Sequence, residues 1–188
     1  MWQWFGCAVA RRRIQHSLTA TPGILRNLDM GLMPEDHKFM HRAIELARVA
    51  EREGNLPVGA VISLDGEVVA EGRSAIWVPK LDATRHAEME ALRAVPTDLW
   101  ISSEEMSLYT TLEPCLMCLG SILLYGIGRV VFGSPDSYGG AGSVLSHLPP
   151  FFQERIENTQ WLGPIKPAEC DPLHERLLAL EEARKTTK

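Results

Sequence analysis

One histidine and two cysteines stand in the chain with the spacing of a metal site. Cys115 and Cys118 are three residues apart, and Pro114 before them is typical of a helix start. At that spacing both sulfurs lie on one side of the first helical turn, where the helix dipole lowers thiolate pKa values. With His86 as a nitrogen ligand, the set predicts a Zn²⁺ site with an open fourth position, which is the pattern of a catalytic site.

Glu88 indicates what the metal is for. His86 and Glu88 are two residues apart, so they converge only in the first turn of a helix. Asp82 and Thr84 are suitable caps ahead of that turn, and Pro96 ends the helix. A carboxylate beside zinc can take the proton of a water, whose pKa falls from 15.7 to about 7 on the metal, and deliver it to a leaving group.

Each part of this pattern has a simpler interpretation when it is taken alone. A single Cys-x-x-Cys is often half of a structural zinc site or a redox pair, and a single histidine often belongs to the core. A noncatalytic, zinc-stabilised binding protein is therefore the alternative from another class, with His41, His147 or His174 as the fourth ligand. Glu88 and the three-ligand count speak against it.

Length and composition indicate one globular domain. The chain has 188 residues, 45% of them hydrophobic and 23% charged, which is enough for one core. No apolar run is long enough to cross a bilayer, so no membrane partner is expected. The two further cysteines, Cys7 and Cys170, give no disulfide framework, and a reducing, cytoplasmic location is the default expectation.

Charge divides the chain into a basic leader and an acidic remainder. Residues 1–32 hold four arginines and one acid, a net charge of +3, so the rest carries −8 of the total of −5. We expect a disordered leader or an over-extended start over residues 1–32 and a single domain over residues 33–188. An organelle-targeting peptide is the less favoured interpretation of the leader. An acidic domain is a poor electrostatic partner for a nucleic acid.

The remaining pattern alternates helices and strands. Asp65–Gly66 between two apolar runs predicts a β-hairpin. Gly59 and Ala60 in its first strand lack bulky side chains, which would let a flat ring approach the backbone; alternatively, Gly59 only makes room for packing. Trp77, in the next loop, could stack on a base or cover the core. The expected helices are residues 34–53, 86–94, 114–123 and 167–180, and the expected strands are residues 58–62, 68–70, 106–110, 129–133 and a short one at 161–162. The first helix opens with Pro34, Glu35 and Asp36 in its first turn, where proline and acids favour a helix start. We expect Leu116, Leu119, Ile122 and Leu123 to form the buried stripe of the third helix, and Leu173, Leu177 and Leu180 that of the last, which ends in a charged tail from Glu181 to Lys188. Both metal-bearing helices thus begin beyond strand ends, where open α/β sheets place their sites.

His-x-Glu followed by Pro-Cys-x-x-Cys resembles the signature of the zinc-dependent cytidine and deoxycytidylate deaminase superfamily. The chain is most similar to bacterial tRNA adenosine deaminases and related nucleobase and nucleoside deaminases, over residues 56–61, 109–118 and 128–133 with Asp136 beyond them. The resemblance implies an α/β fold, a three-layer α-β-α sandwich around a five-stranded mixed sheet, usually as a homodimer. It also implies a heteroaromatic base over the zinc, near the backbone of Ala87 and Cys115.

The departures from the family concern the substrate. Ser74 stands where relatives usually have an asparagine that binds the substrate, and Pro135 stands at a position that is often basic in the tRNA enzymes. The sequence favours hydrolytic deamination of a free nucleobase or nucleoside, with tRNA wobble adenosine-to-inosine deamination as the alternative. The expected roles are metal binding by His86, Cys115 and Cys118, catalysis by Glu88, and substrate binding by Ser74, Gly59, Ala60, Ala87, Asp136 and Trp77.

Overall fold

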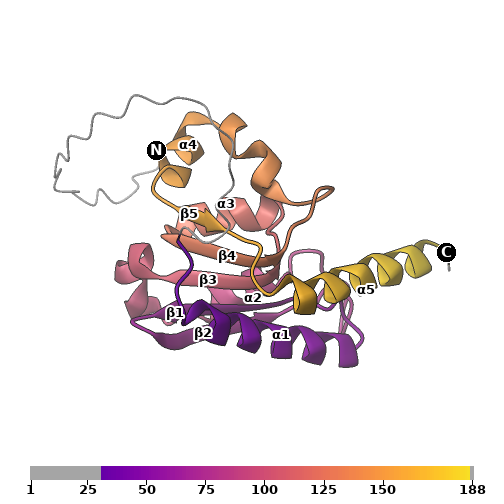
Figure 1. Ribbon diagram of the computed structural model, residues 1–188. Helices are drawn as coiled ribbons and strands as arrows, with labels where there is room; N and C mark the ends of the chain where they lie inside the picture. Colours follow the sequence, from indigo (N-terminus) through magenta and orange to yellow (C-terminus); the bar gives the residue numbers. More distant parts are fainter. Residues whose placement is uncertain (1–30, 187–188) are drawn as a thin grey trace, which may run out of the picture.

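A five-stranded mixed sheet forms the middle layer of the structure, a computed structural model that describes residues 31–186 (Figure 1). The strand order is β2-β1-β3-β4-β5, with β1 antiparallel to both neighbours and β3, β4 and β5 parallel. The strands are β1 (Gly59–Leu64), β2 (Glu67–Arg73), β3 (Ser107–Leu112), β4 (Arg129–Ser134) and β5 (Gln160–Leu162). The predicted α/β class and all five predicted strands are therefore confirmed. Nearly all of the predicted leader lies outside the described residues.

Side-chain alternation along the strands places one helical layer on each face of the sheet. Val61, Tyr109 and Val131 pack against α1 (Asp36–Arg52) and the start of α5 (Pro167–Thr186). The residues next to them in sequence pack against α2 (Ala87–Ala94) and α3 (Leu116–Tyr125), because successive side chains on a strand point to opposite faces. The result is the three-layer sandwich, and α5 reaches beyond the end of α1 (Figure 1).

The β1–β2 hairpin turns at the dipeptide that the sequence indicated. Asp65 and Gly66 both have positive φ angles, 52° and 78°. This is the conformation that a two-residue hairpin turn requires, and aspartate and glycine tolerate it best.

Two glycines allow helices to lie close to this hairpin. A Cβ at Gly59 would lie 2.1 Å from the carbonyl oxygen of Ala43 in α1, and a Cβ at Gly72 would lie 2.1 Å from that of Ala87 in α2. Gly59 therefore serves helix packing, and Gly72 seats the start of α2 against the sheet.

A buried ion pair fastens the start of α1 to the sheet. The guanidinium of Arg129 in β4 donates to both oxygens of the Asp36 carboxylate at 2.7 and 2.6 Å, and the Tyr109 hydroxyl donates to one of them at 2.8 Å. Asp36 is fully buried. The acid predicted simply to favour the helix start is thus also the anchor of that start.

Three local predictions need correction. Asp82 does not cap α2; its Oδ1 accepts from the backbone N–H of Thr84 at 2.9 Å inside the preceding loop, and His86 is the N-cap. The second metal-bearing helix begins at Leu116, with Cys115 as its N-cap, so Pro114 precedes it. Leu116, predicted to be buried, is 61% exposed, because it follows the N-cap on the outer side of α3.

The region between β4 and β5 is more helical than expected. It contains a 3₁₀ segment, η2 (Ala141–His147), and the short helix α4 (Pro150–Ile156). Another 3₁₀ segment that the sequence did not predict, η1 (Thr97–Glu105), lies between α2 and β3. Their short apolar runs are too brief to show helical periodicity in the sequence. Within residues 31–186, no helix is both long and apolar enough to cross a membrane.

Candidate active site

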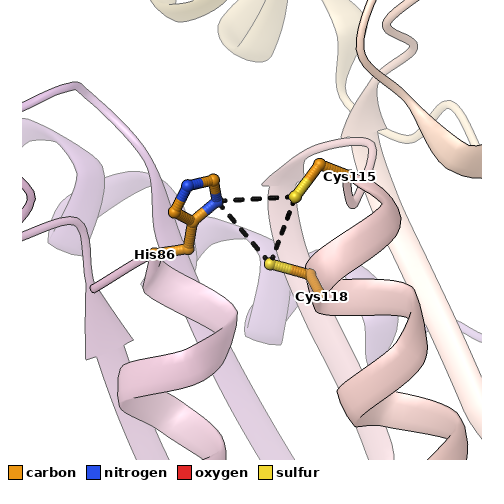
Figure 2. Close-up of side chains that lie close together, drawn as sticks. All are labelled: His86, Cys115 and Cys118. Carbon is orange, nitrogen blue, oxygen red and sulfur yellow. Dashed lines mark hydrogen bonds between the residues drawn. The ribbon is translucent and has the colours of Figure 1, made fainter. Parts of the chain in front are cut away.

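The three predicted metal ligands meet where two neighbouring helices begin. His86 is the N-cap of α2 and Cys115 the N-cap of α3, with Cys118 in the first turn of α3. Figure 2 shows the imidazole and the two sulfurs pointing toward one another. The Nδ1 atom of His86 lies 3.7 Å from Sγ of Cys115 and 3.6 Å from Sγ of Cys118, and the two sulfurs are 3.7 Å apart.

This triangle has the dimensions of a zinc site. Zinc binds nitrogen at about 2.0 Å and sulfur at about 2.3 Å, so ligands at tetrahedral angles lie about 3.5–3.8 Å from one another. The three observed separations fall in that range. The donor set and its spacing therefore fit Zn²⁺, and the fold leaves the fourth tetrahedral position without a protein ligand among the described residues.

None of the three histidines considered as a fourth ligand joins this group. His41 lies beside Glu45, Nδ1 of His174 lies 3.4 Å from Ser134 Oγ, and Nδ1 of His147 contacts Ser146. A structural zinc site would normally use four protein ligands. A group of three protein ligands leaves the fourth coordination position open, as a catalytic zinc site requires.

The pKa values of the two cysteine thiols are shifted in opposite directions. Hydrogen bonding from Cys118, together with the smaller effect of His86, lowers the pKa of Cys115 to about 4 against the opposing effect of burial. The same contact, together with burial, raises the pKa of Cys118. The pKa of His86 is raised, first by its hydrogen bond to Cys115, against desolvation, and then by the charges of neighbours that include Glu88 and Glu181. A lowered thiol pKa favours the thiolate form, which is the form that binds a metal cation.

Glu88 lies in the first turn of α2, in the protein interior beside the metal ligands. Its side chain is almost completely buried, and Oε1 lies 3.3 Å from the hydroxyl of Thr110, which donates to it. Burial raises the pKa of Glu88, because the low-dielectric surroundings disfavour the charged carboxylate. A carboxylate whose pKa is raised is a stronger base than an ordinary carboxylate, and the carboxyl group formed can return the proton.

A cavity of about 280 Å³ opens beside these residues. Its inner wall includes the buried residues Ser74, Ala87 and Glu88, and its outer part includes the exposed residues Tyr138, Leu178 and Glu181. The complete lining is Leu56, Val58, Ser74, Ile76, His86, Ala87, Glu88, Leu112, Glu113, Cys115, Asp136, Tyr138, Gly139, Leu177, Leu178 and Glu181.

A second hollow of about 320 Å³ lies beside β2 and includes none of the metal ligands. Its two arginines, Arg73 and Arg85, are both paired with glutamates, Glu53 and Glu90. This second hollow is slightly larger than the first cavity. Because it lacks the metal ligands and its arginines are already paired, it is not the site of the chemistry.

The structure brings together three of the six predicted substrate contacts. Ser74, Ala87 and Asp136 line the cavity, whereas Gly59, Ala60 and Trp77 do not. The Cα atom of Gly59 faces α1, and Ala60 is part of the core between the sheet and α2. The Trp77 ring packs at the edge of that core, with the guanidinium of Arg184 4.2 Å from its centroid, so it covers the core as the alternative interpretation proposed.

Sequence reasoning missed the contribution of α5 to the cavity. Leu177, Leu178 and Glu181 line it, although they lie far along the chain from the metal motif. Leu177 was predicted only as a core residue, and Glu181 only as the start of a charged tail. The helical period of α5 identifies its apolar face but carries no signal of which cavity that face closes.

A glycine-rich loop, residues 134–143, follows β4 and folds around Glu113. The Glu113 carboxylate accepts the backbone N–H of Asp136 at 2.9 Å and that of Gly142 at 3.1 Å. A Cβ at Gly140 or Gly142 would lie 2.5 or 2.2 Å from this carboxylate. The glycines therefore let the loop close on Glu113, which positions Asp136 and Tyr138 at the cavity.

A five-stranded α-β-α sandwich with a histidine, two cysteines and a buried glutamate at two helix starts defines a zinc-dependent hydrolase. The family model for the cytidine and deoxycytidylate deaminase zinc-binding region matches residues 33–134, more than half of the chain. The chain belongs to this family, and it is a zinc-dependent hydrolytic deaminase.

Individual relatives agree with this assignment. The chain is 38% identical over 120 residues to the tRNA-specific adenosine deaminase of Bacillus subtilis (strain 168), covering 62% of this chain and 72% of the relative. A solved structure from a study of A-to-I editing by tRNA:A34 deaminases matches with a TM-score of 0.55 and 34% identity, over 62% of this chain and 92% of that one. Acinetobacter baumannii RibD matches with a TM-score of 0.58 and 25% identity, over 77% and 39%.

Proposed function

We propose that this deaminase acts on a free nucleobase or nucleoside. Water adds to the ring carbon that bears the exocyclic amino group, the carbon–nitrogen bond breaks, and the products are the ring carbonyl compound and ammonia. His86, Cys115 and Cys118 hold Zn²⁺, which supplies a Lewis acid that lowers the pKa of water.

In this proposal Glu88 moves the protons of the reaction. Its carboxylate accepts one proton from the attacking water and passes it to the ring nitrogen. It then accepts the second proton from the added hydroxyl group and passes it to the departing amine as the carbon–nitrogen bond breaks. Burial of Glu88 supports this role, because it raises the pKa of the carboxyl group and so makes the carboxylate a stronger base toward water. The hydroxyl of Thr110 orients the carboxylate by donating to Oε1.

The charge of the cavity is the observation that carries the choice of substrate. Its lining contains no lysine or arginine, and its four ionisable carboxylates are Glu88, Glu113, Asp136 and Glu181. Proteins bind the phosphates of nucleic acids mainly with lysine and arginine. An acidic cavity of about 280 Å³ suits one uncharged ring system with a small substituent.

Ser74 supports a polar contact to the base. Its Oγ atom is buried and has no hydrogen-bond partner among the described residues, and Ser74 lines the inner wall of the cavity. A buried hydroxyl without a partner is costly, so a ring nitrogen or carbonyl of the substrate is a suitable partner for it.

The second candidate is deamination of an adenosine in tRNA. It is favoured by one specific observation, the 38% identity with the Bacillus subtilis relative, which is described as tRNA-specific. In this case cationic side chains outside the cavity would have to bind the phosphates of the tRNA.

The experiment is ammonia release by zinc-loaded protein against a panel of free bases, nucleosides, and an unmodified tRNA carrying adenosine at the wobble position. Glu88→Ala protein serves as the blank at each substrate. Turnover of a base or nucleoside supports the proposal, and turnover of the tRNA alone replaces it with the second candidate.

A homodimer is part of the proposal. The helix α3 contains no charged residue, and its outer side exposes Leu116, Leu124 and Tyr125. A second copy would bring an equally uncharged helix, and two-fold pairing of the same face is the common arrangement for homodimers. We expect light scattering to give twice the mass of one chain for the wild type, and one chain mass for Leu124→Glu. A wild-type monomer would contradict the proposal.

A further inference from the structure

The orientation of the proposed substrate follows from where the chemistry lies in the cavity. The metal ligands, Glu88 and the unpartnered hydroxyl of Ser74 belong to the inner part. The reacting base must therefore enter first, and any sugar or phosphate attached to it must point toward the opening.

One carboxylate at that opening has no hydrogen-bond or ion-pair partner among the described residues. Glu88 is buried at the reacting end, Glu113 accepts two loop amides, and Asp136 accepts the amides of Tyr138 and Gly139. The carboxylate of Glu181, by contrast, forms no hydrogen bond or ion pair with any residue in the range 31–186. Because Glu181 is exposed and also lines the cavity, it lies at the opening, beside Leu178.

An ionised carboxylate can accept hydrogen bonds but cannot donate them. At the opening it accepts N–H or O–H groups of a base or sugar, and it repels a phosphate. No lysine or arginine among the residues that line the cavity offsets this repulsion.

We propose that Glu181 is a specificity-determining residue that excludes phosphorylated substrates, so that the enzyme takes an unphosphorylated base or nucleoside in preference to the corresponding nucleotide. This inference rests on the proposed function and names the role of one residue in it. Glu181 does not take part in the bond changes, so its removal should alter the choice of substrate more than the rate of the chemical step.

The test compares Glu181→Gln with Glu182→Gln, which removes the same charge from the next residue of α5. Glu182 is a suitable control because its side chain is largely exposed, lies near Lys185 and does not line the cavity. For the base that the wild type deaminates, the nucleoside and its 5′-monophosphate are measured as substrates and as competitive inhibitors. Zinc content and the midpoint of thermal unfolding are measured for all three proteins.

In Glu181→Gln we expect the preference for the nucleoside over the monophosphate to fall about tenfold, which corresponds to about 1.4 kcal/mol, and in Glu182→Gln to stay at the wild-type value. Raising the ionic strength from about 0.01 M to about 1 M shortens the Debye length from about 30 Å to about 3 Å. The preference should therefore fall with salt in the wild type and fall less in Glu181→Gln, which a purely structural role would not produce.

The experiment distinguishes failure of the role of Glu181 from failure of the proposed function. Equal preferences in the two variants overturn the role of Glu181, even when the wild type deaminates a free nucleoside. Turnover of tRNA alone by the wild type overturns the proposed function instead. The role of Glu181 is then measured on the tRNA, where Glu181→Gln should exceed Glu182→Gln in kcat/KM, and equality of the two would overturn it.

Discussion

Removal of the Asp36 carboxylate should destabilise the protein strongly. Its oxygens accept four hydrogen bonds, two from Arg129, one from Tyr109 and one from the backbone N–H of Met33 at 2.6 Å. The side chain of Arg129 is only 9% exposed, so Asp36→Ala would leave a buried guanidinium without a counter-charge. Breaking such a pair from one side costs about 3–5 kcal/mol.

An exposed pair of the same chemistry provides the matched control. Arg73 donates to both oxygens of Glu53 at 2.7 and 2.9 Å, and both side chains are 44% exposed. Water replaces those contacts, so Glu53→Ala should cost about 0–1 kcal/mol. In thermal unfolding followed by circular dichroism, we expect the midpoint of Asp36→Ala to fall by about 6–20 °C and that of Glu53→Ala to fall by a few degrees at most.

The pH dependence gives the same prediction a second test. Burial alone would raise the pKa of Asp36, but the hydrogen bonds from Arg129, Met33 and Tyr109 outweigh it and hold the pKa below its ordinary value of 3.8. A carboxyl group with a lowered pKa in the folded state stabilises the fold above its unfolded pKa, and it loses that contribution as the pH falls. The difference in unfolding free energy between wild type and Asp36→Ala should therefore shrink below about pH 3.8.

The double variant Asp36→Ala with Arg129→Met separates the ion pair from the fold. Because it removes the stranded charge, it should be more stable than Asp36→Ala alone. Equal midpoints for Asp36→Ala and Glu53→Ala, or a double variant less stable than the single one, would refute the reasoning.

Three further changes test the site. Glu88→Gln should retain zinc in metal analysis while kcat falls about 10²–10⁴-fold, and unchanged turnover would exclude Glu88 as the proton carrier. Cys118→Ser should lose zinc, whereas Cys170→Ser, a buried cysteine on the other face of the sheet, should keep it; equal zinc contents would contradict the assigned ligand set. Gly72→Ala places a Cβ 2.1 Å from the carbonyl of Ala87, so it should displace the start of α2 and lower both the unfolding midpoint and zinc retention. Wild-type values of both would show that the hairpin does not seat the helix.

The sequence by itself predicted the three side chains that form the metal-ligand group, because much of the information there is local. Cys115 and Cys118 are held by one helical turn, and His86 and Glu88 by another, so spacing alone fixes which side chains can point the same way. The hairpin at Asp65–Gly66 was likewise predictable, since its φ angles depend on the two residues themselves.

Only the tertiary structure decided the rest of the cavity. Glu181 reaches it from the last helix, the glycine-rich loop closes on Glu113, and Trp77 packs on the core beneath Arg184 instead of lining the cavity. These contacts join elements that are far apart along the chain. A residue's own neighbours in sequence set its helix or strand and its buried side, but which distant element meets it there depends on how the layers pack.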